Sequence, residues 1–115
     1  MPMYLVQGNY SADAWARLMK KPEDREASLR KAVESMGGKL HAFYFTFGQS
    51  DVCVLMEMPD NKSMMAAAII ATAGGASPKT TVLISAAEAK KAMQLAKSEQ
   101  SKYTPPGGKA GKGSK

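Results

Sequence analysis

The sequence predicts an α+β domain in which two helices pack on one face of a four-stranded antiparallel sheet. Three observations predict it: short apolar runs alternate with helical patterns, two Gly-Gly pairs follow helical patterns, and a glycine-containing turn joins the two middle strands. The resulting element order is β-α-β-β-α-β with a further C-terminal helix. This order is that of the split βαβ, or ferredoxin-like, arrangement.

The first part of the chain is expected to form one strand and two helices. Residues 3–10 favour a strand, and Ser11 is the expected N-cap of a short helix. Pro22 interrupts that helix, because a proline inside a helix removes a hydrogen bond and clashes with the preceding turn. Pro22 instead suits the first turn of a second helix, and Gly37-Gly38 is the expected left-handed stop of that helix.

A hairpin is expected next, with strands over residues 40–47 and 52–58 joined by the turn at residues 48–51. Both strands are apolar on both faces. In the first, one alternate set is His41, Phe43, Phe45 and Phe47, and the other is Leu40, Ala42, Tyr44 and Thr46. An antiparallel sheet with one face in water should instead alternate apolar with polar residues. A second copy of the sheet, packed face to face about a two-fold axis, would cover the other face, so the sequence predicts a homodimer or a larger assembly of dimers.

The remaining elements follow from capping residues and β-branched runs. Asp60 is the expected N-cap of a helix over residues 62–73, which contains five alanines. A strand is predicted over residues 80–84. A capping box at residues 85–88 opens a last helix, which is expected to end near Ala96.

The composition predicts one domain over residues 1–97 and a flexible tail rich in Lys, Gly and Pro over residues 98–115. Half of the formal net charge of +6 lies in this tail. Aromatic residues for base stacking are scarce there, since Tyr103 is alone. Nucleic acid is therefore not an expected partner, and a weak nucleic-acid accessory role through the basic tail is the second alternative function.

Other functional classes lack their signatures. Cys53 is the single cysteine, which excludes an internal disulfide and fits a reducing compartment. The N-terminus has no signal-peptide pattern, and the longest apolar run is too short for a membrane span, so a cytoplasmic location without membrane association is expected. No CxxC, HExxH, P-loop, GxGxxG or GxSxG pattern occurs, so no metal and no cofactor are expected. The nine methionines favour adaptable core packing over Cu(I) ligation.

The stretch from Gly37 to Asp60 carries a family resemblance. It combines a Gly-Gly pair, an aromatic strand, Gly-x-x-Asp at residues 48–51 and an apolar strand that ends near Pro-Asp. In these features, and in the Pro-x-x-Arg pattern of residues 22–25, the chain resembles the GYD-domain family over roughly residues 3–90. The resemblance implies the fold of the dimeric α/β-barrel proteins and names no reaction. Ser50 stands where the family pattern has tyrosine, so no role of that tyrosine is carried over.

Five residues are candidates for a ligand site: Asn9, Trp15, His41, Tyr44 and Asp51. His41 is the only histidine and the natural acid-base group, with a solvated strand-end histidine as the alternative. The Tyr44 hydroxyl could orient a ligand if its face of the sheet lines a cavity; a buried, hydrogen-bonded tyrosine is the alternative. Asp51 is expected to bond amides of its own turn. Some barrel relatives open haem with Asn, Trp and His, but their spacing differs from that of Asn9, Trp15 and His41, which favours coincidence.

The sequence therefore favours an oligomeric binding or regulatory domain that holds a small apolar ligand between sheet and helices. The alternative is an enzyme of the monooxygenase or isomerase kind found on related barrels, cofactor-free or haem-linked, with His41 and Tyr44 as its polar groups. That alternative requires a pocket into which one of these two side chains points.

Overall fold

The computed structural model describes residues 1–108. A first compact unit spans Met1–Leu83, and a second begins at Ile84. The elements of the first unit are, in order, β1 (Met3–Tyr10), α1 (Ala12–Lys20), α2 (Arg25–Ser35), β2 (Lys39–Phe45), β3 (Val52–Glu57), α3 (Asn61–Ala73) and β4 (Ala76–Leu83).

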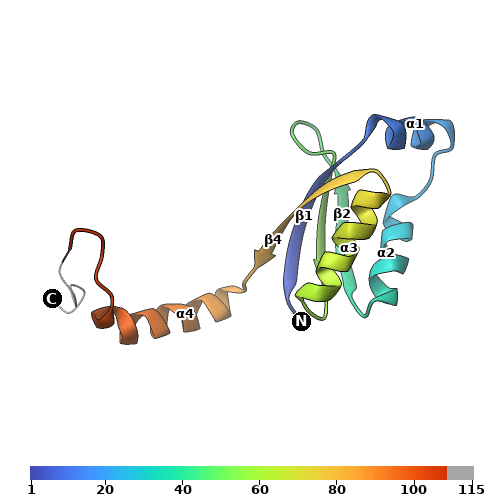
Figure 1. Ribbon diagram of the computed structural model, residues 1–115. Coiled ribbons are helices and arrows are strands. Elements are labelled where there is room, and N and C mark those ends of the chain that lie inside the picture. Colours follow the sequence, from blue (N-terminus) through green and yellow to red (C-terminus); the bar gives the residue numbers. More distant parts are fainter. Residues whose placement is uncertain (109–115) are drawn as a thin grey trace. The chain divides into compact units, whose positions relative to one another are not determined.

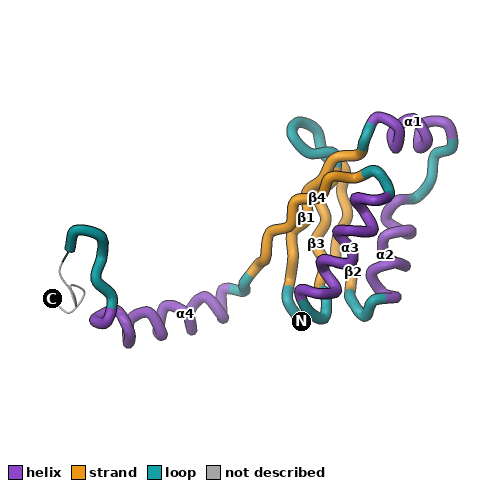
Figure 2. Tube along the Cα trace, in the orientation of Figure 1, coloured by secondary structure: helices purple, strands orange, loops and turns teal. Residues whose placement is uncertain are grey.

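The four strands form one antiparallel sheet in the order β2-β3-β1-β4. Helices α2 and α3 lie side by side on one face of this sheet, and α1 lies beyond the end at which β1 finishes (Figure 1). Within Met1–Leu83, no helix lies on the opposite face (Figure 2). We call the two sides the covered face and the open face. The predicted α+β fold with four antiparallel strands is confirmed.

The core lies between the covered face and the two helices. Its buried residues come from both central strands, β2, α2, α3 and the segment before α3: Tyr4, Val6, Val33, Leu40, Val54, Met56, Met58 and Met64. Full burial of one such side chain stabilises the fold by about 1.5–3 kcal/mol. The covered face is therefore the main source of stability in this unit.

Side-chain caps set most helix starts as the sequence predicted. Ser11 and Asp60 each accept a hydrogen bond from the amide three residues further along the chain. The expectation that Pro22 opens α2 is wrong, because the carboxylate of Asp24 accepts from the amide of Ala27 and the helix begins only after this cap. At the other end of α2, Gly37 has a φ of 84°, as expected for a left-handed stop.

The outer strands differ from the prediction in length. β2 ends at Phe45 rather than residue 47. β4 begins at Ala76 rather than residue 80, and it contains Pro78. A proline is tolerated there because β4 is an edge strand, where half of the backbone N–H groups have no neighbouring strand to bond.

β2 also contains a bulge that the alternation pattern missed. Leu40 and Ala42 pair with adjacent residues of β3, Met56 and Leu55, which leaves His41 as the extra residue. Leu40 therefore lies on the covered face, where it is buried. The predicted assignment, which put Leu40 on the same face as Ala42, is wrong because the bulge shifts the alternation by one residue.

The second unit contains α4 (Ala86–Glu99) and a 3-10 turn, η1 (Gln100–Lys102). The Ser85 hydroxyl accepts from the amide of Glu88, so the predicted cap forms. The helix runs three residues beyond the expected end at residue 96. The division of the chain after residue 97 stays a prediction, and residues 109–115 of the predicted tail lie outside the described residues.

Candidate ligand-binding pocket

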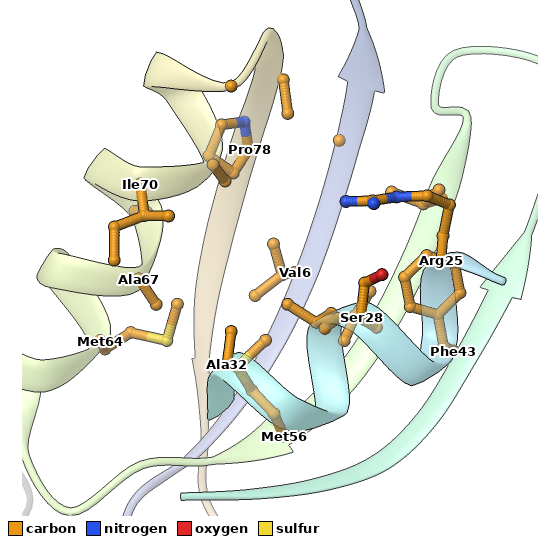
Figure 3. A pocket seen from close by; sticks show the side chains of 18 of the residues that line it. Val6, Arg25, Ser28, Ala32, Phe43, Met56, Met64, Ala67, Ile70 and Pro78 are labelled. Carbon is orange, nitrogen blue, oxygen red and sulfur yellow. The ribbon is translucent and has the colours of Figure 1, made fainter. Parts of the chain in front are cut away.

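A pocket of about 310 Å³ lies between the sheet and helices α2 and α3 (Figure 3). Within the described chain, 20 residues line it, and 17 of them have no polar side-chain group. Pockets for small molecules usually enclose about 300–1,000 Å³. At about 30 Å³ for each water molecule in the liquid, this one offers space for roughly ten non-hydrogen atoms.

Small side chains explain why this space is not filled. They come from the sheet, α2 and α3, and include Gly8, Ala32, Ala67, Ala68, Ala71 and Ala76. Protein interiors are usually packed so closely that few voids exceed a water molecule. The alanines that the sequence places in residues 62–73 thus create a ligand-sized space instead of a tight helix-sheet contact.

Polar groups gather at one end of the pocket. Arg25, the first residue of α2, extends its guanidinium into the pocket, and the Ser28 hydroxyl lies nearby (Figure 3). Tyr10, the last residue of β1, lines the same end. Arg25 Nη1 donates to Glu23 Oε1 at 2.6 Å. Partial burial opposes the charge on Arg25, but the contacts with Glu23 and the Tyr10 hydroxyl outweigh it, so the pKa of Arg25 is raised.

The other end of the pocket is formed by thioethers. Met36 at the end of α2, Met56 of β3 and Met64 of α3 line it. Met56 pairs with Tyr4 near the start of β1, whereas Tyr10 ends that strand. The pocket therefore has a polar end and an apolar end, and methionine side chains can adapt to the shape of a bound group.

An aromatic cluster borders the polar end. The rings of Tyr10 and Trp15 meet edge to face with centroids 5.2 Å apart, and Phe45 lies 6.2 Å from Trp15 and 5.4 Å from Phe43. Tyr10 and Phe43 line the pocket, and Trp15 and Phe45 are exposed. Since Trp15 is the only tryptophan and touches a lining residue, its fluorescence should report on the pocket.

Asp51 holds this cluster in place. One carboxylate oxygen, Oδ2, accepts from the Tyr10 amide at 2.9 Å and from the Trp15 indole at 3.0 Å. The expectation that Asp51 bonds amides of its own turn is wrong, because the turn brings the carboxylate to the end of β1. Asp51 therefore links the hairpin, β1 and α1.

His41 and Tyr44 lie on the open face of the sheet. His41 Nε2 is 2.9 Å from Glu57 Oε1, and Tyr44 is 68% exposed. The hydrogen bond with His41 lowers the pKa of Glu57 below its ordinary value, and nearby Lys39 adds to the effect. Neither His41 nor Tyr44 lines the pocket.

The five residues selected from the sequence thus fall into separate places in the described chain. Trp15 and Asp51 are in contact beside the pocket. Asn9 is exposed near the same end of the sheet. His41 pairs with Glu57, which lies opposite Met3 in the sheet. Met3 and Asn9 are about 20 Å apart along β1, so His41 lies far from Asn9. One chain does not bring Asn9, Trp15 and His41 together.

Sequence reasoning missed Tyr10, Arg25 and Ser28 as site residues. One sequence feature points to Arg25: it is a charged residue at the start of a helix whose later turns have an apolar stripe. No sequence feature points to the hydroxyls of Tyr10 and Ser28, since both residue types are common at strand ends and on helix surfaces.

Residues 1–108 contain neither a cluster of metal-ligating side chains nor a helix that could span a membrane. No group of three or more His, Cys, Asp or Glu side chains is placed to hold a metal ion. No helix in this part of the chain has the length and apolar character that crossing a bilayer requires.

Fold and pocket together define a small α+β domain with an apolar, ligand-sized space between its helices and its sheet. The family model described as GYD domain matches residues 4–93, and the chain therefore belongs to the GYD domain family. No curated protein and no solved structure matches it. The family predicted from the stretch between Gly37 and Asp60 is confirmed.

Proposed function

We propose that this GYD domain is a homodimeric small-molecule-binding domain, and that each subunit holds a compact apolar ligand between α2, α3 and the sheet. The observation that carries this proposal is the pocket of about 310 Å³ with its 17 nonpolar lining residues. A space of this kind, with a few polar groups at one end, has the character of a ligand site.

The open face supports a second copy as the partner. Its central strands carry Leu5, Cys53 and Leu55, which a single chain leaves only half-buried. Lys39 and Glu57 lie on the same face and have opposite charges, so a two-fold axis can pair one with the other. The strand order β2-β3-β1-β4 also agrees with the ferredoxin-like arrangement that the family resemblance implies for a dimeric barrel.

The outer side of α3 supports an assembly of dimers. Met65 and Ile69 are 66% and 58% exposed there. Apolar residues grouped on the outside of a helix favour contact with a further subunit.

We assign no reaction to the domain. The enzyme hypothesis requires His41 or Tyr44 to point into a pocket, and both lie on the face of the sheet away from the one described. No observation on the described residues favours catalysis over binding.

Binding of 1-octanol, a neutral probe of about ten non-hydrogen atoms, tests the proposal. Titration calorimetry and Trp15 fluorescence should both report saturable binding. Ala67→Phe places a ring inside the pocket and should weaken binding at least about tenfold, because the ring takes up space that the probe needs. Ala73→Phe, on an exposed position of the same helix, is the matched control and should bind like the wild type. Equal binding by wild type and Ala67→Phe would exclude the pocket as the site.

A further inference from the structure

We infer that the pocket selects a small monocarboxylic acid, with its apolar body between helices and sheet and its carboxylate on the guanidinium of Arg25. The inference rests on the proposed function, because it specifies the ligand of the same pocket. It names a chemical class, an aliphatic or arylalkanoic acid of roughly ten non-hydrogen atoms.

The charge distribution of the lining carries the first step. Among the lining residues of the described chain, Arg25 alone has a charged side chain. Its side chain is about two-thirds buried, since 34% of its surface is exposed. A charge at the edge of an apolar space attracts an opposite charge more strongly than it would in water. The site is therefore built to accept one negative group.

The geometry of Arg25 carries the second step. A guanidinium has five N–H donors in a planar fork that matches the two oxygens of a carboxylate. Only Nη1 bonds Glu23, whose side chain is 46% exposed, and an exposed ion pair of this kind holds its partner weakly. Among residues 1–108, the Tyr10 hydroxyl is the other contact of this guanidinium, so further donors of the fork can bind a ligand.

The neighbouring hydroxyls strengthen the polar end. Ser28 lines the pocket near Arg25 (Figure 3). Tyr10 also lines the pocket and contacts Arg25 through its hydroxyl. Each hydroxyl can donate to a carboxylate oxygen. Charge-assisted hydrogen bonds are stronger than neutral ones, so three donors on two oxygens discriminate an acid from the corresponding alcohol.

The limits of the site restrict the acid to one anionic group. Glu23 beside Arg25 would repel the second charge of a phosphate dianion. The opposite end, formed by Met36, Met56 and Met64, has no group that could satisfy a second carboxylate. A dicarboxylic acid would therefore leave one charge buried without a partner.

Paired probes test the inference: octanoate against 1-octanol, and 3-phenylpropanoate against 3-phenylpropan-1-ol, at pH 7 with titration calorimetry and Trp15 fluorescence. Wild type should bind each acid about tenfold to a hundredfold more tightly than its alcohol. Arg25→Met should abolish this preference while still binding the alcohols. Arg25→Lys keeps the positive charge but lacks the planar set of donors, so it should retain part of the preference for acids. Lys31→Met removes one positive charge from an exposed position of α2 and should leave the preference unchanged.

The outcomes separate this inference from the proposed function. Equal binding of acid and alcohol by wild type, with both lost in Ala67→Phe, would overturn the selection of acids and leave the pocket as a binding site. An acid preference that survives in Arg25→Met would overturn the role of Arg25. Binding of neither acid nor alcohol would overturn the proposed function and this inference with it. A preference of one acid over the other would identify the body of the ligand as aliphatic or aromatic.

Discussion

The two faces of the sheet carry similar apolar side chains and meet different surroundings. Along β3, Val54 and Met56 point to the covered face and are 3% exposed, whereas their neighbours Cys53 and Leu55 point to the open face and are half-buried. The strand thus provides two apolar surfaces, and the helices of one chain use only one of them. Packing within one chain therefore explains the apolar residues of β3 that face the helices, and the proposed second copy would explain those on the open face.

The polar groups of the two faces differ as well. The covered face has Arg25 at the end of an apolar space. The open face has the His41–Glu57 pair, with Lys39 nearby. A single charge beside a cavity suits a ligand of the opposite charge, whereas the opposite charges of Lys39 and Glu57 suit a self-complementary surface.

The largest expected effect is a difference in stability between a variant of the covered face and a variant of the open face. Val54→Asp places a carboxylate in the core and should destabilise the fold by about 4 kcal/mol or more, enough to unfold a small domain. Leu55→Asp, one residue away on the open face, should keep the folded circular dichroism spectrum. Thermal melting of both variants checks this, and equal melting temperatures would contradict the difference between the faces.

The next effect concerns association. Leu5→Asp should weaken the proposed dimer by at least about a hundredfold, because an interface would bury an unpaired carboxylate. Light scattering should then give a mass near the monomer value of 12.3 kDa, while the wild type gives at least twice that mass. Ala27→Asp, at an exposed position of α2, should not change the mass. A wild-type mass near 12.3 kDa at micromolar concentration would rule out the dimer.

A smaller effect concerns the end of the sheet at which β1 finishes, where Asp51 lies. Asp51→Ala removes the acceptor of the Tyr10 amide and the Trp15 indole and should cost about 1–3 kcal/mol. Urea unfolding measures the loss, and Trp15 fluorescence should shift because the indole loses its partner. Ser50→Ala in the same turn is the control, since only the backbone carbonyl of Ser50 bonds Thr46. Unchanged stability and fluorescence in Asp51→Ala would show that the link is unimportant.

The smallest effect is a pH dependence on the open face. The hydrogen bond with His41 lowers the pKa of Glu57 in the folded state. Such a group stabilises the fold fully at pH values above its ordinary pKa of 4.5, and this contribution disappears as the pH falls through the lower folded value. Glu57→Gln should therefore flatten the loss of stability between neutral and acidic pH. Identical acid unfolding curves for the variant and the wild type would contradict this role.

Local signals made much of the fold predictable from sequence. Ser11, Asp60 and Ser85 cap helices through contacts within three residues, so their roles can be inferred without the tertiary structure. The start of α2 was harder to predict because Pro22 and Asp24 are both typical of a helix start. In the structure, Asp24 is the N-cap and the helix begins after it. Each of these helix starts depends on a few neighbouring residues.

The site was harder to predict because it depends on elements that meet only in the fold. Alanines of residues 62–73 indicate an apolar helix, but a cavity forms only where they face Gly8 and Ala32 across the core. The bulge at His41 depends on the pairing of β2 with β3, which no local pattern determines. His41 and Tyr44 were chosen by residue type, and residue type does not reveal on which face a pocket lies.

The bulge at His41 also determines where this strand can change its length during evolution. At most positions of β2, loss of one residue would turn every later side chain to the opposite face. Loss of His41 would not, because Leu40 and Ala42 already pair with consecutive residues of β3. Alignments of GYD domains should therefore tolerate a single gap at this position, and the histidine can be gained or lost without any rearrangement of the sheet.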